Sequence, residues 1–155
     1  MTHALRIRRL EVDEPAFDIV ARWRHDAFFA DDGTPFENLR DALRTWMREL
    51  GYETALLAEV NGSPAGSCLF VRKEIDAKHD LTPWLAALYV APAYRKRSIG
   101  SALVRAIEQH ARNVGCTELY LYTVTAESFY AKLDWITRER FDWHGEPMAL
   151  MAREL

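Results

Sequence analysis

Residues 85–115 carry the pattern that most constrains how this chain folds. Leu85 to Val90 form a continuous apolar run with the length of a buried strand. From Ile99 to Val114, apolar residues recur at three- and four-residue steps, which predicts an amphipathic helix that begins after Ser98 and ends at Gly115. Another apolar run of strand length, Leu119 to Thr123, follows. The sequence therefore predicts a strand, a turn, a helix and a second strand in this order.

The turn before this helix is basic. Three consecutive cations, Arg95, Lys96 and Arg97, precede it, and Gly100 lies in its first turn. A helix N-terminus already carries partial positive charge and unpaired N–H groups, so cations destabilise it unless an anion binds. Glycine in a helix costs about 0.5–1 kcal/mol relative to alanine, and its use here would be to let a ligand approach the backbone. A bound phosphate explains these residues, and so does a solvated turn with an incidental glycine.

The remaining segments predict further strands and helices that share one core. Strands are expected near 5–10 and over 53–60, 65–73, 135–143 and 148–153, and helices over 14–29, 36–50 and 127–133. Asn61-Gly62 is a strong hairpin signal between two of these strands. Because no repeat, linker or low-complexity tract interrupts them, we expect one domain over residues 1–155.

Composition narrows the class of protein. The chain has 155 residues, 49% of them hydrophobic, and a net charge of −3, which argues against a general nucleic-acid binder. It has no apolar run of 18 residues and no signal-peptide pattern, so we expect a cytoplasmic protein without a membrane partner. Cys68 and Cys116 are expected to be free thiols, and the five histidines lack metal-binding spacing, so no metal is expected.

Three segments together carry a resemblance to a known family. The stretch Arg97-Ser98-Ile99-Gly100-Ser101-Ala102 matches the R/Q-x-x-G-x-G/A signature of the GNAT superfamily of acetyl-CoA-dependent N-acetyltransferases. Upstream, 88–92 resembles the fourth strand of that family, and downstream, 128–135 is similar to its F-Y-x-K-L-G-F/W segment. Beyond these three, the last stretch, 148–155, also resembles the closing strand of the family. The resemblance implies an α/β, single-domain GNAT-like fold with a mixed, mostly antiparallel central sheet of six to seven strands and helices on both faces.

The resemblance also implies a cofactor, acetyl-CoA, with coenzyme A as product. The implied cofactor-binding residues are Leu88, Tyr89, Val90, Arg95, Lys96, Arg97, Ser98, Ile99, Gly100, Ser101, Thr123 and Tyr130. In the family, the backbone of the fourth strand binds the pantetheine and the amides of the turn bind the pyrophosphate. Tyr130 matches the tyrosine that protonates the departing thiolate, a role that suits a phenol because its pKa is comparable. A core aromatic is the alternative interpretation of Tyr130.

The sequence departs from the family pattern at several positions. Lys96 and Ser98 stand where further glycines are usual, and Thr123 stands where many members have asparagine. Asp134 replaces a glycine, and aspartate tolerates left-handed backbone geometry better than most residues. Residues 83–90 contain no Glu, Asp or His, so the general base is unassigned. His79 and the adjacent Asp80 lie just upstream. Either they serve as the general base through a water molecule, or they are simply exposed loop residues.

The acceptor pocket is expected where two loops meet in the family. One loop offers acidic residues near Asp31 and Asp32, and the other offers Trp143 and Glu146, with Glu37 and His144 close by in sequence. Carboxylates attract a protonated amine, and an indole adds a cation–π surface. These residues favour a small cationic amine over a peptide N-terminus or a lysine, although each residue type is also common on solvated loops.

The function expected from these features is transfer of the acetyl group of acetyl-CoA to a primary amine. The amine would attack directly in a ternary complex, with Tyr130 as general acid. The alternative is a non-catalytic GNAT-like module that binds acetyl-CoA as a sensor or mediates protein contacts. A P-loop phosphotransferase is excluded because the sequence has no G-x-x-x-x-G-K-[ST] motif. We expect no nucleic-acid partner, and a homodimer remains possible.

Overall fold

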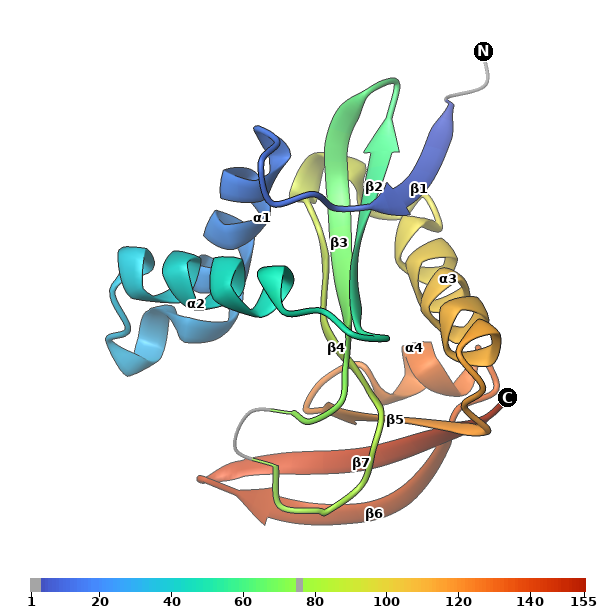
Figure 1. Ribbon diagram of the computed structural model, residues 1–155. Coiled ribbons are helices and arrows are strands. Elements are labelled where there is room, and N and C mark those ends of the chain that lie inside the picture. Colours follow the sequence, from blue (N-terminus) through green and yellow to red (C-terminus); the bar gives the residue numbers. More distant parts are fainter. Residues whose placement is uncertain (1–3, 75–76) are drawn as a thin grey trace. The chain divides into compact units, whose positions relative to one another are not determined.

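A computed structural model describes residues 4–74 and 77–155 and contains a seven-stranded sheet in the order β1-β2-β3-β4-β5-β7-β6 (Figure 1). The sheet is mixed, because β4 pairs with β5 in parallel while β1–β2, β5–β7 and β6–β7 are antiparallel. The predicted fold class is therefore confirmed. The chain divides into two compact units, one running to Leu69 and including Ala87–Ile107, the other comprising Phe70–Ala86 and Glu108–Leu155.

All eleven of the expected segments contain a regular element, several with shifted ends. The strands are β1 (Leu5–Arg9), β2 (Thr54–Val60), β3 (Ser63–Val71), β4 (Trp84–Val90), β5 (Glu118–Thr123), β6 (Ile136–Trp143) and β7 (Glu146–Glu154). The helices are α1 (Ala16–Arg24), α2 (Phe36–Arg48), α3 (Ile99–Asn113) and α4 (Glu127–Ala131). The helix expected over 14–29 is wrong in one respect, because after Arg24 the chain continues as a π-helical turn, His25–Phe29.

In the first unit, helices cover both faces of the sheet. Figure 1 shows α1 and α2 on one side of β2 and β3 and the start of α3 on the other. The α2 helix buries Leu39, Leu43 and Met47, which are four residues apart and therefore lie on one face. Asn61 and Gly62 both have positive φ (51° and 83°), so the hairpin turn predicted between β2 and β3 is confirmed.

In the second unit, β7 lies between β5 and β6. Leu121 of β5 and Thr137 of β6 both pair with Met151 of β7. The turn before β7 uses His144 and Gly145 with positive φ (52° and 83°), so β7 begins at Glu146, two residues earlier than expected. Asp134 follows α4 with φ 73°, which confirms that this aspartate takes the left-handed geometry of the glycine it replaces.

Candidate active site

The basic turn keeps a glycine-type backbone without glycines. Lys96 and Ser98 have φ of 63° and 62°, in the left-handed region that costs an ordinary residue about 1–2 kcal/mol. At these two positions the family that the sequence resembles usually has glycine. Both side chains are exposed, as are those of Arg95 and Arg97. The backbone of this turn therefore follows a shape that its own residue types disfavour.

Unpaired backbone amides follow the turn. The first helical hydrogen bond of α3 runs from Ala102 N to Ser98 O at 3.1 Å, so the N–H groups of Ile99, Gly100 and Ser101 precede the helical ladder. The first turn of α3 has no acidic residue. Its positive helix end, with the cations beside it, is suited to an anion.

The end of β4 lies beside this turn in the same unit. Arg95 Nε donates a 2.8 Å hydrogen bond to Val90 O, and its guanidinium carbon lies 5.6 Å from the Tyr89 ring centroid. The Tyr89 ring also contacts Trp23 of α1, with centroids 5.3 Å apart. Leu88, Tyr89 and Val90 are half-buried. The structure thus brings together the expected β4 contacts and the expected turn contacts.

Gly66 of β3 allows β4 to approach closely. A Cβ atom at Gly66 would lie 2.7 Å from Tyr89 O and 3.2 Å from Leu103 Cδ1. Next to it, Ala91 N donates to Ala65 O at 2.8 Å. Sequence reasoning did not identify Gly66, because an isolated glycine in a strand does not reveal which backbone will pass over it.

Thr123 and Tyr130, the other expected cofactor contacts, belong to the second unit. Thr123 Oγ1 accepts a 3.0 Å hydrogen bond from Ala126 N and so fixes the chain as it enters α4. Tyr130 is buried, and its ring lies 5.0 Å from that of Phe129 and 5.9 Å from that of Trp135. Tyr130 is therefore held in one orientation by aromatic packing.

A buried carboxylate supports this packing. Trp135 Nε1 donates to Glu108 Oε2 at 3.0 Å, and the other Glu108 oxygen lies 3.9 Å from Arg112 and 3.7 Å from Arg153. Glu108 and Arg112 are four residues apart on α3, and although a glutamate in an amphipathic helix is usually exposed, Glu108 is only 1% exposed. Its partner Trp135 stands 27 residues further on, so helical periodicity alone cannot locate it.

The expected acceptor residues divide between the two units. Asp31 and Asp32 lie in an exposed 3-10 turn of the first unit, where Asp32 Oδ1 accepts from Thr34 N at 3.0 Å and from its hydroxyl at 2.5 Å. These bonds lower the pKa of Asp32 and close the turn. In the second unit, Trp143 and Glu146 pair across the β6–β7 turn, and both are accessible to solvent.

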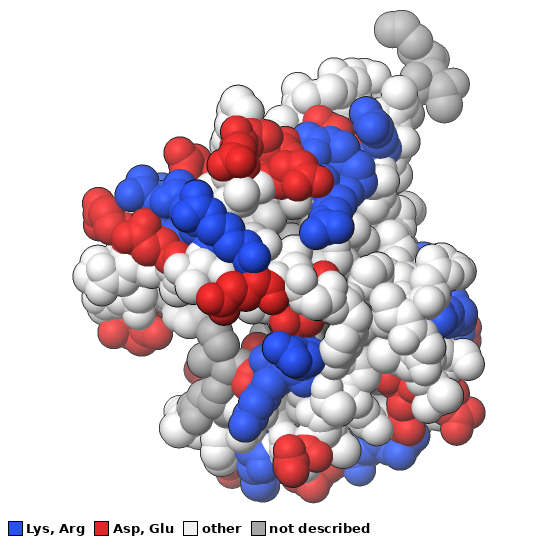
Figure 2. Space-filling model, viewed as in Figure 1, with Lys and Arg blue, Asp and Glu red and all other residues white. Residues whose placement is uncertain are grey.

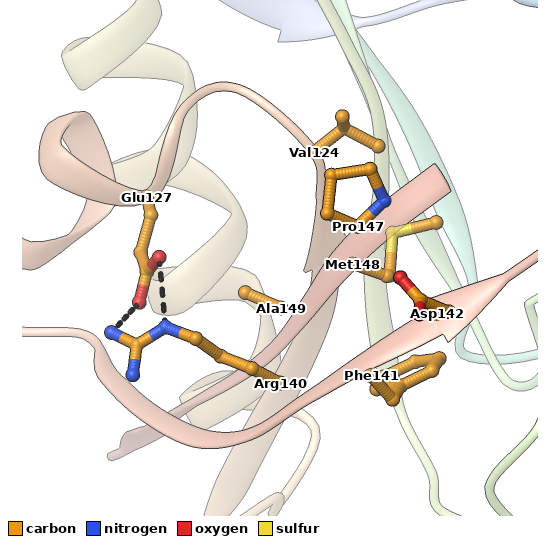
Figure 3. Close-up of a pocket in the computed structure, with 8 residues that line it drawn as sticks. All are labelled: Val124, Glu127, Arg140, Phe141, Asp142, Pro147, Met148 and Ala149. Atoms are coloured by element: carbon orange, nitrogen blue, oxygen red, sulfur yellow. Dashed lines mark hydrogen bonds and ion pairs between the residues drawn. The ribbon is translucent and has the colours of Figure 1, made fainter. Parts of the chain in front are cut away.

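The second unit also holds a cavity of about 340 Å³ at the β6–β7 end (Figure 3). Its lining residues are Val124, Glu127, Arg140, Phe141, Asp142, Pro147, Met148 and Ala149. Glu127 accepts hydrogen bonds from Thr137 and, at 2.7 Å, from Arg140, and both bonds lower its pKa. Figure 3 shows the Asp142 carboxylate beside Met148, away from that ion pair. Among the expected acceptor residues, none lines this cavity.

His79 lies in a hydrogen-bonded chain rather than free in a loop. Its Nδ1 is 2.6 Å from the Tyr122 hydroxyl and its Nε2 is 3.2 Å from Glu139 Oε2. The backbone N–H groups of Lys78 and His79 donate to the same hydroxyl at 3.2 and 3.1 Å. The His79 side chain is 18% exposed, so the sequence-based alternative of a freely exposed loop residue is wrong for His79.

Side chains of opposite charge lie side by side at several places on the surface. Figure 2 shows Lys and Arg side chains interleaved with Asp and Glu side chains on the face that it draws. In the first unit, Arg8 lies 2.6 Å from Glu14 and 2.7 Å from Glu59, and Arg44 lies 3.4 Å from Asp41. None of the helices in the described residues has the length and hydropathy needed to cross a bilayer.

Among known protein families is one whose sequence profile matches most of this chain. The sequence profile of the Acetyltransferase (GNAT) family matches residues 17–135. The chain belongs to this family. Among curated protein sequences, none matches this GNAT chain.

Solved structures resemble the GNAT chain over nearly its full length. An aminoglycoside 6'-N-acetyltransferase complexed with coenzyme A is 16% identical, with a TM-score of 0.76 and 96% of each chain covered. The yncA protein of Salmonella typhimurium, determined with its cofactor acetyl-CoA, is 16% identical with a TM-score of 0.76, covering 97% of this chain and 94% of that one. An N-acetyltransferase from Staphylococcus aureus Mu50 is 16% identical with a TM-score of 0.77, covering 97% and 98%. These likenesses establish the GNAT fold.

Proposed function

We propose that this GNAT protein transfers the acetyl group of acetyl-CoA to a primary amine, which attacks directly in a ternary complex. The observation that carries the proposal is the turn before α3, where Lys96 and Ser98 keep left-handed backbone angles at a cost to stability. Such strain persists where function requires the geometry. We treat residues 1–155 as one N-acetyltransferase domain, because both units carry residues that the family motif assigns to the cofactor.

The residues of the first unit fit a coenzyme A molecule. The amides of Ile99, Gly100 and Ser101 and the guanidinium of Arg97 would bind the pyrophosphate, with Arg95, Lys96 and Ser98 shaping the turn around it. The half-buried backbone of Leu88, Tyr89 and Val90 would bind the pantetheine. Acetyl-CoA supplies the acetyl group as a thioester. Two of the resembling structures, the aminoglycoside acetyltransferase and yncA, were determined with coenzyme A and acetyl-CoA respectively.

In the second unit, Tyr130 is proposed as the general acid. Its ring is fixed between Phe129 and Trp135, which would hold the hydroxyl at a constant position. A phenol can give its proton to a thiolate because the two groups have comparable basicity. Thr123, which anchors the entry to α4, is proposed as a further cofactor contact.

For the acceptor, we propose a cationic amine. Asp31 and Asp32 of the first unit and Glu146 of the second are exposed carboxylates, and Trp143 of the second unit is an accessible indole; each of these groups by itself suits an ammonium ion. If these carboxylates contact the acceptor, their exchange for Asn or Gln should raise KM for cationic amines and leave KM for acetyl-CoA unchanged. Added salt should weaken the same step. Equal rates for neutral and cationic acceptors would contradict an acidic pocket.

The second candidate function is a non-catalytic acetyl-CoA sensor. It is favoured by the absence of Glu, Asp and His from β4, where many members of the family have a catalytic carboxylate. A panel of primary amines, assayed for release of free coenzyme A and for acetylated product by mass spectrometry, separates the two. Turnover with any amine supports the enzyme; acetyl-CoA binding without turnover across the panel supports the sensor.

A further inference from the structure

Glu108 is a carboxylate that lies almost entirely inside the second unit. Its Oε1 lies 3.7 Å from Nε of Arg153 on β7 and 3.9 Å from Nη2 of Arg112. These distances are too long for hydrogen bonds, so the two guanidinium groups supply opposite charge rather than a directed bond. A directed bond comes from Trp135, whose Nε1 donates to Glu108 Oε2 at 3.0 Å.

Stability alone does not explain a carboxylate at this position. A buried charge loses its hydration, and the replacement of a buried ion pair by apolar residues of similar volume is often neutral or stabilising. Arg153 Nε, moreover, is buried and makes no hydrogen bond within the part of the chain that the structure describes. A leucine in place of Glu108 would lack an acceptor for the Trp135 indole N–H. The specific effect of Glu108 is therefore to set the orientation of one indole ring.

The indole of Trp135 in turn holds Tyr130. The two ring centroids lie 5.9 Å apart with an interplanar angle of 59°, and both residues are buried. Trp135 N also donates to Tyr130 O at 3.1 Å, because the left-handed Asp134 turns the chain back onto the end of α4. Trp135 therefore contacts both the backbone and the ring of Tyr130. An indole free to rotate about χ2 would leave the phenol ring a larger range of positions.

We propose that Glu108 is a positioning residue for Tyr130, an inference that rests on the proposed function. The carboxylate fixes the indole of Trp135, and the indole holds the phenol where it meets the departing thiolate. Tyr130 gives its proton to the sulfur, which keeps the electron pair of the broken C–S bond. The acceptor nitrogen loses one proton as its bond to the acetyl carbon forms, and this proton restores the phenol through solvent. Glu108 acts only through Trp135 and takes no proton itself.

A double-mutant cycle with Tyr130 tests the proposal, with the fastest-reacting primary amine of the panel described above as acceptor. Glu108→Leu removes the acceptor of the indole N–H. It should lower the single-turnover rate by about 10–10²-fold, the effect of a misplacement of about 1 Å, and leave the KM for acetyl-CoA little changed. In the Tyr130→Phe background no phenol proton is left to position, so the same substitution should change the rate by no more than about twofold.

A merely structural role for Glu108 gives a different result. General loosening of the second unit lowers the rate by the same factor with and without the Tyr130 hydroxyl, so equal factors in both backgrounds would overturn the proposal. An unchanged rate in Glu108→Leu would overturn it as well. Thermal unfolding shows whether each variant is folded at the assay temperature. If Glu108→Leu is not, Trp135→Phe goes through the same cycle, because it keeps an aromatic ring and removes the N–H donor, and it must show the same coupling to Tyr130.

Glu118→Leu is the matched control. Glu118 is another carboxylate of the second unit, at the start of β5, and it accepts a 2.7 Å hydrogen bond from Arg138 on the surface. Its replacement makes the same chemical change outside the bond to Trp135, so the single-turnover rate should stay within about twofold of the wild type. A fall as large as that of Glu108→Leu would show that the rate does not depend on the indole bond, against the proposal.

The proposed function fails at a separate point. If no amine of the panel is acetylated, or if Tyr130→Phe reacts at the wild-type rate, Tyr130 is not the general acid and both proposals fall. If Tyr130→Phe is slow but the cycle shows no coupling, only the positioning role of Glu108 falls. Relaxation NMR of a carbon-labelled Tyr130 ring gives a readout without turnover: the ring should be more mobile in Glu108→Leu than in the wild type, and equal mobility would overturn the positioning role.

Discussion

Gly66→Ala is expected to destabilise the protein and to weaken acetyl-CoA binding. The added methyl would lie 2.7 Å from Tyr89 O, whereas carbon and oxygen approach comfortably only to about 3.3 Å. The two strands must therefore separate by about 0.6 Å, and Leu103 Cδ1, 3.2 Å away, limits movement on the helix side. Overpacking of this kind costs about 1–3 kcal/mol, which corresponds to a fall in Tm of about 2–12 °C for a chain of this size.

The consequence for binding follows from the position of Tyr89. Its carbonyl belongs to the segment Leu88–Val90, which we propose as the pantetheine contact, so its displacement should raise the Kd for acetyl-CoA. Urea unfolding and thermal scans, with and without acetyl-CoA, measure both effects. Isothermal titration calorimetry gives the Kd directly.

Gly51→Ala is the matched control. A Cβ at Gly51 meets no atom within 4 Å, and its backbone is not left-handed, so the same change should be neutral or stabilise by about 0.4–1 kcal/mol. If Gly66→Ala and Gly51→Ala unfold at the same temperature, the close approach of β3 and β4 does not determine stability. If Gly66→Ala loses stability but keeps the wild-type Kd, Tyr89 does not position the cofactor.

Three further predictions address the site. Acetyl-CoA at one hundred times its Kd should stabilise the native state by about 2.7 kcal/mol, and Gly100→Glu should abolish the shift by adding a like charge. Tyr130→Phe should lower the single-turnover rate by about 10²–10⁴-fold with little change in the KM for acetyl-CoA; an unchanged rate would make Tyr130 a packing residue. Because bonds from Thr137 and Arg140 depress the pKa of Glu127, its stabilising effect is present above its ordinary pKa and fades as pH falls through the depressed value. Carbon NMR should show that titration move upward in Arg140→Ala.

Local chemistry made much of the fold predictable from sequence. Asn61-Gly62 specifies a tight hairpin because both residues tolerate positive φ, and Asp134 was expected to keep a glycine-type turn for the same reason. The helix beginning at Ile99 follows from its apolar periodicity. Such features depend on neighbours in sequence, so they can be identified without a structure.

Features that depend on distant partners could not be predicted in this way. Glu108 looks like a surface residue until Trp135 and Arg153 are brought to it. His79 is hydrogen-bonded to Tyr122, 43 residues away, and to Glu139, 60 residues away. In each case the side chain is polar and its sequence neighbours give no sign of a partner, so only the folded structure reveals what it contacts.

The order β5-β7-β6 has a consequence for folding during synthesis. Since β7 lies between β5 and β6, neither strand has its shared neighbour until residues 146–154 have been made. Until β7 has paired, the edge of β5 is an open template for other chains. A chain truncated before Glu146 should therefore have a lower soluble yield than the full chain, and adding residues 146–154 back should restore it.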